Sequence, residues 1–411
     1  MAFRPDGLKD FQARVVGLIE GQDGIEADAE ASDEAKGERR FRLRREQFLL
    51  EDAEEIDYYR SLGVDPESRQ FPALHRSGLL SGADTTEVQA ARDYWQSEWG
   101  VDIDPSFHIA FSAVTGGADV RVVPQSEYRT IWRLLNPGQS TIQAYSDKVL
   151  FSRLLPTSRQ PVTSLVCIDG RYYDGDAAWL PHQSEVIETL ARVGRGIIKP
   201  TSMDNGRGVD VIEHLGGDRL KLGSRETDLE DLAQRYRKNF MVQEIVRQHE
   251  TLAEPHPNSL NTLRVVTLRW GGEVHHLLTF ARFGVDGRIN DNAGTGGLCV
   301  GVQRDGTLSD YGINEHGMIA TAHPSTGTVF GEMSAVPAYG KVLDFARELH
   351  ASVPYFDLLS WDIGVDPDAE PVLIECNFRG AVWLYQLAAG QPLFGDLTSE
   401  LLSSIRPDHG A

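Results

Sequence analysis

The sequence has little cysteine, no long apolar run and no secretory pattern at its start. Its three cysteines, Cys167, Cys299 and Cys376, lie far apart without metal-ligand spacing, so we expect reduced residues within the core. No stretch approaches the apolar length of a membrane span, and the opening residues MAFRPDGLKDFQ lack an apolar core and a cleavage site. We therefore expect a soluble, cytoplasmic protein without a membrane partner.

Basic residues are also scarce relative to acidic ones. Lys and Arg number 40 against 61 Asp and Glu, which gives a formal net charge of -21. Nucleic-acid binding needs basic surface that displaces phosphate counterions, so we expect no nucleic-acid partner. A small polyphosphate needs only a few local cations and stays compatible with this charge. Since no Gly-Lys-Ser/Thr opens a helix, a P-loop nucleotide enzyme is disfavoured.

The pattern of polar and apolar residues changes after about residue 115. Residues 1–115 are polar and predict a mainly helical region. From about residue 116, strand-length apolar runs alternate with helical segments and predict an α+β fold with antiparallel hairpins. In detail, ADVRVVPQ (118–125) predicts a short strand, and SDKVLFSRLL predicts a helix capped by Ser146.

The most informative stretch is DLLSWDIGVDPDAEPVLIECN, residues 357–377. Turn formers at 366–369 between two apolar runs predict a hairpin that places Asp362 opposite Glu375, with Asn377 on the same face. Opposed carboxylates repel at about 5 Å and are stable mainly with a positive charge between them. Because Mg²⁺ prefers a few carboxylates together with phosphate oxygens, we predict a metal shared with a nucleotide; the alternative is a solvated hairpin face.

A second hairpin is predicted in IIKPTSMDNGRGVDVIEHL. Lys199 ends its first strand, and Gly206 and Gly208 stand in the loop. Glycines let a backbone approach phosphate oxygens, and the lysine adds a point charge, so a phosphate-covering flap is one interpretation and an ordinary turn the other.

The run FMVQEIV is a strand in which Gln243 and Glu244 interrupt apolar residues and Val246 follows. A strand end beside an adenine offers backbone donors and acceptors with apolar flanks. A plain core strand explains the pattern equally well.

Two arginines stand in apolar runs. Arg264 lies in NTLRVVTLRW, where an uncompensated guanidinium is costly, so it should face an anion. Arg282, in LLTFARFG, invites the same argument more weakly because it is near a strand end. The following loop, RINDNAGTGG with Asp291 and Asn292, either closes over a substrate or is a glycine-rich turn.

Taken in order, these motifs resemble the ATP-grasp superfamily, and most closely the sugar-transfer-associated branch. The matching features are Lys148 in YSDKVLFSRLLP, Lys199 in IIKP, VQEIV, NSLNTLRVVTL, DNAGTGG, and Asp362 with Glu375-x-Asn377, over roughly residues 118–395. One departure is SMDNGRGV, which carries Arg207 and fewer glycines than family members usually have.

The resemblance implies an ATP-grasp domain over 116–411, in which two α+β subdomains, about 140–240 and 241–395, enclose ATP. It implies that ATP contacts Lys148, Lys199, Gly206, Gly208, Gln243, Glu244 and Val246. It implies that Mg²⁺ is held by Asp362, Glu375 and Asn377. Arg264, Arg282 and Arg379 are the candidate catalytic residues, facing the transferred phosphate or the substrate anion.

The expected function is ATP-dependent carboxylate ligation through an acyl phosphate, with release of ADP and phosphate. The partners would be a small-molecule or peptide carboxylate and an amine or other nucleophile, and homodimer formation is left open. The alternatives are a kinase that phosphorylates a hydroxyl on the same scaffold and a nucleotide-binding regulatory protein without turnover.

Overall fold

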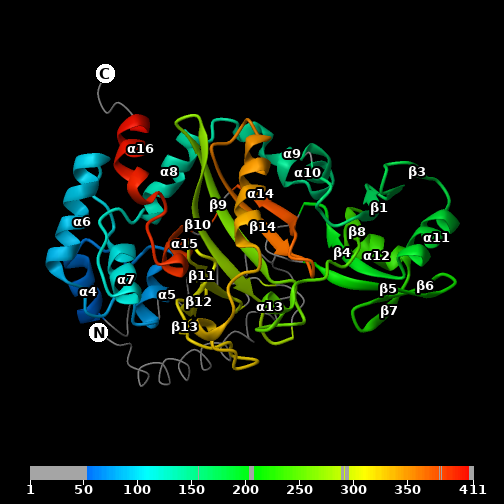
Figure 1. Ribbon diagram of the computed structural model, residues 1–411, viewed down its shortest axis with the longest axis horizontal. Coiled ribbons are helices and arrows are strands. Elements are labelled where there is room, and N and C mark those ends of the chain that lie inside the picture. The colour runs from blue at the N-terminus through cyan, green and yellow to red at the C-terminus, as the bar shows by residue number, and fades with distance from the viewer. Residues whose placement is uncertain are drawn as a thin grey trace. The chain divides into compact units, whose positions relative to one another are not determined.

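The computed structural model describes residues 53–155, 157–202, 208–287, 291, 296–378, 380 and 382–406 (Figure 1). Two compact units divide the chain: the first ends at Ile131 and also includes 315–318 and the segment from Gly390, and the second comprises 132–314 and 319–389. In the described ranges, no helix has the length and apolarity needed to cross a lipid bilayer.

The first unit is helical, as residues 1–115 predicted for the part that is described. Its elements are α4 (Ala53–Ser61), α5 (Phe71–Arg76), α6 (Thr85–Glu98), α7 (Ser106–Thr115), most of α8 (Gln125–Leu135), η4 (Gly395–Leu397) and α16 (Thr398–Ile405). Asp84 caps α6 by accepting hydrogen bonds from the backbone N–H groups of Thr86 and Glu87. The helix buries Trp95, whose indole N–H donates to the Val120 carbonyl at 2.9 Å.

The predicted strand over 118–125 is wrong. This segment forms a turn, because the Asp119 carboxylate accepts hydrogen bonds from the backbone N–H and the guanidinium of Arg121. Val122 and Val123 are buried, and their apolar character produced the strand pattern. No described strand lies beside them to complete a ladder.

The second unit begins with η1 (Gln139–Thr141), α9 (Ile142–Ser146) and α10 (Lys148–Leu154). The helix predicted around Lys148 is present, but its cap is Asp147 and not Ser146, because Ser146 still belongs to α9. The Asp147 carboxylate accepts from the backbone N–H groups of Val149 and Leu150. The Lys148 backbone N–H donates to the Thr201 carbonyl at 2.8 Å, which ties the start of α10 to the end of a strand.

An eight-stranded antiparallel sheet follows, in the order β3-β2-β1-β8-β4-β5-β6-β7. Its strands are β1 (Thr163–Ile168), β2 (Arg171–Asp174), β3 (Trp179–Leu180), β4 (Arg195–Pro200), β5 (Asp210–Gly216), β6 (Arg219–Leu222), β7 (Arg225–Thr227) and β8 (Phe240–Gln243). Helices α11 (Gln183–Val193) and α12 (Leu229–Arg235) share one hydrophobic core with alternate strand residues such as Leu165, Ile198 and Phe240. The two-residue alternation therefore turns the remaining set to the other face: Val166, Lys199, Met241 and Gln243.

The second sheet has seven antiparallel strands in the order β13-β12-β11-β10-β9-β14-β15. They are β9 (Thr262–Trp270), β10 (Glu273–Phe283), β11 (Leu298–Val302), β12 (Leu308–Ile313), β13 (Ile319–Ala320), β14 (Leu358–Val365) and β15 (Pro371–Asn377). The other elements are α13 (Glu250–Ala253), η3 (Phe330–Glu332), α14 (Tyr339–Ala351) and α15 (Val382–Ala389). The two antiparallel sheets with their helices confirm the α+β prediction.

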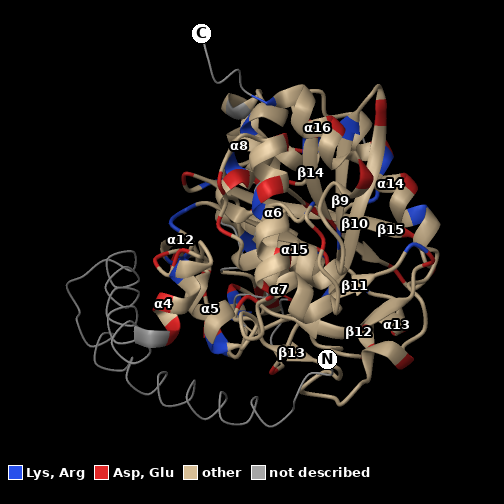
Figure 2. Ribbon diagram, turned by 90° about the vertical axis from the view of Figure 1, so that its left-hand side faces the viewer, with Lys and Arg blue, Asp and Glu red and all other residues tan. Residues whose placement is uncertain are grey.

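Helices α14 and α15 cover opposite faces of this sheet. His350 of α14 and Trp361 of β14 both hydrogen-bond the Thr267 hydroxyl, so α14 lies on the Trp361 face. Tyr385 of α15 reaches the face that carries Arg264 and Asp362. Charged positions of both signs are interspersed along α6 and α14, as Figure 2 shows, and these helices present no purely basic face.

Candidate active site

The β14–β15 hairpin has the predicted register. Asp362 is the cross-strand partner of Glu375, and Ser360 that of Asn377. The five-residue turn between Val365 and Pro371 would, by itself, place Ile374 opposite Asp362. A bulge between the Asp362 and Ile363 pairs adds one residue to β15, and this residue brings Glu375 into register.

Four side chains occupy one rung across four strands. Phe280 of β10 pairs with Arg264 of β9, Arg264 pairs with Asp362 of β14, and Asp362 pairs with Glu375 of β15. Directly opposed residues in antiparallel strands point to the same face. Arg264 therefore lies between the apolar Phe280 and the two acids, Asp362 and Glu375, in this row.

The Asp362 carboxylate is buried and accepts four hydrogen bonds, three of them at Oδ2. Arg264 grips it with two bonds, Nε to Oδ1 at 2.7 Å and Nη2 to Oδ2 at 2.6 Å. Arg282 adds Nη1 to Oδ2 at 2.9 Å, and the Asn377 amide donates to Oδ2 at 3.1 Å. Burial raises the pKa of the Asp362 carboxyl, but the two guanidinium charges outweigh that effect and hold the pKa below its ordinary value.

Arg282 lies between two acids. Besides Asp362 it pairs with Asp291, with Nη2 at 3.3 Å from Oδ1. The other oxygen of Asp291 accepts from the Thr262 backbone N–H at 3.1 Å and from its hydroxyl at 2.5 Å. Burial raises the pKa of the Asp291 carboxyl, and the Arg282 charge offsets this only in part, so the pKa lies above its ordinary value.

Two lysines stand near Glu375. The Lys148 ammonium donates to Glu375 Oε1 at 2.7 Å. Among the described residues, the Lys199 ammonium has no hydrogen-bond or ion-pair partner. Burial lowers the pKa of Lys199 to about 8; the Lys148 charge adds to this effect, and Glu375 opposes it. Because Lys148 and Glu375 both influence the pKa of Lys199, the end of β4, the start of α10 and the end of β15 lie close together.

Tyr385 was missed by sequence reasoning. Arg264 donates from Nη1 to its hydroxyl at 2.9 Å, and the guanidinium carbon lies 5.8 Å from the ring centroid. The Tyr385 ring also packs on Phe280, with centroids 5.0 Å apart. In the structure a Cβ at Gly380 would lie 2.2 Å from the Tyr385 hydroxyl, so the glycine leaves room for this side chain.

The remaining predicted residues are less connected. Gln243 ends β8, and its amide donates to the Thr163 hydroxyl at 3.0 Å and to the Pro161 carbonyl at 3.3 Å. Glu244 is exposed and Val246 half-buried in the segment after β8. Gly208 has φ of +72°, which favours glycine. Gly206, Arg207, Asn292 and Arg379 lie outside the described residues.

The oxygens of this cluster fit a hard cation. Asp362, Glu375 and Asn377 supply two carboxylates and one amide, and within the described ranges no set of three or more His, Cys, Asp or Glu residues offers a metal site. Among described contacts, Glu375 Oε2 and the Asn377 side-chain oxygen accept no hydrogen bond. A cation held by so few protein oxygens needs phosphate and water oxygens as well, which is the Mg²⁺ preference.

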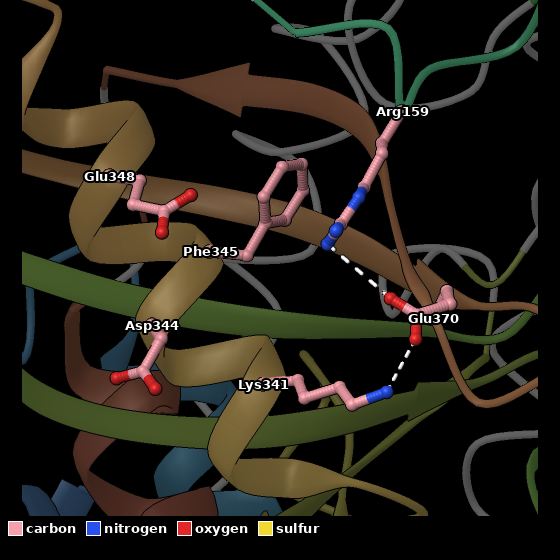
Figure 3. A pocket seen from close by; sticks show the side chains of 6 residues that line it. All are labelled: Arg159, Lys341, Asp344, Phe345, Glu348 and Glu370. Carbon is pink, nitrogen blue, oxygen red and sulfur yellow. Dashed lines mark hydrogen bonds and ion pairs between the residues drawn. The ribbon is translucent and has the colours of Figure 1, made fainter.

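A separate hollow of about 310 Å³ lies beside α14 (Figure 3). Its lining is Arg159, Lys341, Asp344, Phe345, Glu348 and Glu370. Glu370 pairs with both Lys341 and Arg159, whose side chains are about half exposed. None of these residues is a predicted site residue, and surface ion pairs of this kind contribute little stability.

Comparison with known proteins gives one family. A profile described as sugar-transfer associated ATP-grasp matches residues 129–400. No curated protein matches the chain.

Similar solved structures include a putative ATP-grasp superfamily protein from Archaeoglobus fulgidus, with 15% identity, 68% of this chain and 62% of that chain covered, and a TM-score of 0.32. An L-amino acid ligase from Bacillus licheniformis has 12% identity, 78% and 62% coverage, and a TM-score of 0.34. A biotin carboxylase domain from Hydrogenobacter thermophilus, in complex with the magnesium salt of ADP, has 13% identity, 62% and 47% coverage, and a TM-score of 0.33. The chain covers less than two thirds of each of these proteins.

Proposed function

The chain belongs to the sugar-transfer associated ATP-grasp family and has its fold, and from this premise we propose that it is an ATP-dependent carboxylate ligase. ATP phosphorylates a carboxylate, and an amine or another nucleophile then displaces the phosphate. The carboxylate belongs to a small molecule or a peptide. The observation that carries the proposal is the group of four cationic side chains, Lys148, Lys199, Arg264 and Arg282, near the acids Asp362 and Glu375 of the seven-stranded sheet.

The two lysines are the proposed polyphosphate contacts. With its pKa at about 8, Lys199 is mostly protonated at neutral pH, and no described acid forms an ion pair with it. An anion is therefore the partner that its environment lacks. The Lys148 ammonium lies in the same region and donates to Glu375. If this ammonium moved to a phosphate oxygen, the Glu375 carboxylate would become free. The segment Gln243–Val246 is the proposed adenine contact.

ATP and Mg²⁺ are general features of ATP-grasp proteins. In this chain Asp362, Glu375 and Asn377 would hold the ion, which when bound would offset the phosphate charge as bond breaking proceeds. Lys148, Arg264 and Arg282 supply positive charge to these acids in the structure, and a bound ion would take over part of that role.

Arg264 and Arg282 suit a substrate that is itself an anion. A carboxylate oxygen attacks the γ-phosphorus, the bond to the bridging oxygen breaks, and ADP leaves. The amine then attacks the acyl carbon, phosphate departs with one former carboxylate oxygen, and the amine loses a proton. Planar guanidinium groups can stabilise both the incoming carboxylate and the charge that develops on the acyl phosphate. Arg379 is proposed for the same role from the sequence motif alone.

The test uses hydroxylamine in place of the amine, so that only the carboxylate must be varied. A panel of small-molecule and peptide carboxylates is incubated with ATP, Mg²⁺ and hydroxylamine, and ADP release and hydroxamate are measured. For any active carboxylate, labelling with heavy oxygen should transfer one labelled atom to the released phosphate. Glu375→Gln should abolish turnover, whereas the matched control Glu370→Gln, at the turn of the same hairpin, should not.

Two other outcomes would refute the proposal. A stable phosphorylated product, with no hydroxamate and no label in free phosphate, establishes a kinase. ATP binding without ADP release across the panel, with and without added amines, establishes a nucleotide-binding protein without turnover.

A further inference from the structure

We propose that Arg282 adds to the positive charge that Arg264 holds at Asp362 while the metal is absent, and that Arg282 moves onto Asp291 when the metal binds. Asp291 is then a positioning residue for metal binding, which it influences through Arg282 without touching the ion. The inference rests on the proposed metal site at Asp362, Glu375 and Asn377.

The first argument is that Oδ2 of Asp362 has no lone pair to spare. A carboxylate offers about four acceptor sites, two on each oxygen. Oδ2 accepts from Arg264, Arg282 and Asn377, whereas Oδ1 accepts from Arg264 alone. An ion that binds through Oδ2 must therefore displace a donor, and a guanidinium beside a divalent ion is also repelled.

The second argument identifies which donor leaves. Arg264 is held by two bonds to Asp362, by the Tyr385 hydroxyl and by the Tyr385 ring, and it stands directly opposite Asp362 in the strand register. Arg282 has one bond to Asp362 and sits two residues beyond that rung. Asn377 has to turn its amide to present its oxygen to the ion, so its donated bond is lost in either case. Of the two arginines, losing Arg282 costs one bond to Asp362, whereas losing Arg264 costs two bonds to Asp362 and one to Tyr385.

The third argument is that Arg282 has a second acid within reach. The Asp291 carboxylate is fixed by the backbone N–H and the hydroxyl of Thr262, so it forms a stationary acceptor. Its present distance to Arg282, 3.3 Å, is longer than the usual 2.7–2.9 Å of a charge-assisted hydrogen bond. A small shift of Arg282 would shorten this pair while opening Asp362 to the ion.

The experiment is a titration of the full chain with Mn²⁺ in the presence of saturating ADP, in which free Mn²⁺ is followed by electron paramagnetic resonance. Mn²⁺ replaces Mg²⁺ because both favour carboxylate, carbonyl and water oxygens. Arg282→Gln removes the competing charge and should tighten Mn²⁺ binding by about tenfold, the scale of one charge contact in a partly screened site. Asp291→Asn removes the second carboxylate that Arg282 can pair with, and it should weaken Mn²⁺ binding by about the same factor.

The double variant separates positioning from a general loss of order. If Asp291 acts through Arg282, adding Asp291→Asn to Arg282→Gln should leave Mn²⁺ affinity at the Arg282→Gln value. Equal effects of Asp291→Asn in both backgrounds, or unchanged affinity in the single Asp291→Asn variant, would overturn the inference. The exposed Asp344→Asn serves as the matched control and should bind like the wild type. If Arg282→Gln does not fold, unchanged Mn²⁺ affinity in Asp291→Asn still overturns the inference.

Failure of the metal site itself looks different. Glu375→Gln removes a proposed ligand that contacts neither Arg282 nor Asp291 by any described hydrogen bond. If wild type and Glu375→Gln bind Mn²⁺ equally, the proposed metal site is wrong and this inference ends with it. If Glu375→Gln alone loses Mn²⁺ while Asp291→Asn does not, only the inference is wrong.

Discussion

Replacing Asp362 by asparagine should cost far more stability than a change of one atom suggests. The variant keeps the shape of the side chain but leaves Arg264 and Arg282 as buried guanidinium groups without their shared carboxylate. It also turns one acceptor into an amide that donates toward other donors. Breaking a buried pair by removing one partner costs about 3–5 kcal/mol. We expect a loss of that size, which is a large share of the typical ~5–15 kcal/mol for a folded domain.

Urea unfolding followed by tryptophan fluorescence measures the loss, and amide hydrogen exchange in β9 and β14 localises it. Glu370→Gln, in a surface ion pair at the turn of the same hairpin, should leave the stability nearly unchanged. Glu375→Gln, whose side chain is 28% exposed, should lose only about 1 kcal/mol. A loss below about 1 kcal/mol for Asp362→Asn would refute the view that this carboxylate holds the two arginines in place.

Three further predictions follow from single residues. Because the pKa of Lys199 is about 8, the affinity for ATP, measured by calorimetry, should fall as the pH rises through 8. The variant Lys199→Met should bind ATP weakly at every pH, while its affinity for AMP should change little. If Lys199→Met kept the pH dependence of the wild type, this role of Lys199 would be contradicted. Tyr385→Phe keeps the ring on Arg264 but removes its hydroxyl, so kcat should fall by about tenfold, the scale of one hydrogen bond to a charged group, with ATP affinity unchanged; an equal rise in KM for ATP would point to nucleotide binding instead. Burial lowers the pKa of His350 from 6.5 to about 4, so the unfolded state binds a proton at a higher pH than the folded state does. The free energy of unfolding should therefore decrease as the pH falls from about 6.5 to 4, and His350→Gln should make this decrease smaller. An unchanged pH dependence in His350→Gln would rule out His350 as its source.

The fold class and the acid hairpin were predictable because both depend on local chemistry. A two-residue apolar period with turn formers at 366–369 is sufficient to predict a hairpin, and it placed Asp362 opposite Glu375. That register nevertheless depends on a bulge near Ile363, which no turn signal announces. The strand predicted over 118–125 failed for the related reason that an apolar pair indicates burial, while a strand also requires a neighbour.

The arginines mark where sequence reasoning reached its limit. A guanidinium within an apolar run of β9 predicts an anion, and the structure identifies one as Asp362, almost a hundred residues later in the chain. Tyr385, the other partner of Arg264, lies in an apolar helix that offers no such electrostatic argument. Pairings of this kind depend on strand order, which local patterns do not encode.

The sequence by itself determined which residues need a partner: two opposed acids, two arginines in apolar strands and a lysine at a strand end, because burying such groups alone is costly. Only the tertiary structure decided which partners they have. The order β10-β9-β14-β15 sets Arg264 against Asp362, the packing of α10 brings Lys148 to Glu375, and the Arg282 guanidinium reaches both Asp291 and Asp362. Contacts between distant segments determine these pairings, because a buried charge requires a partner of opposite sign but does not specify where in the chain that partner lies.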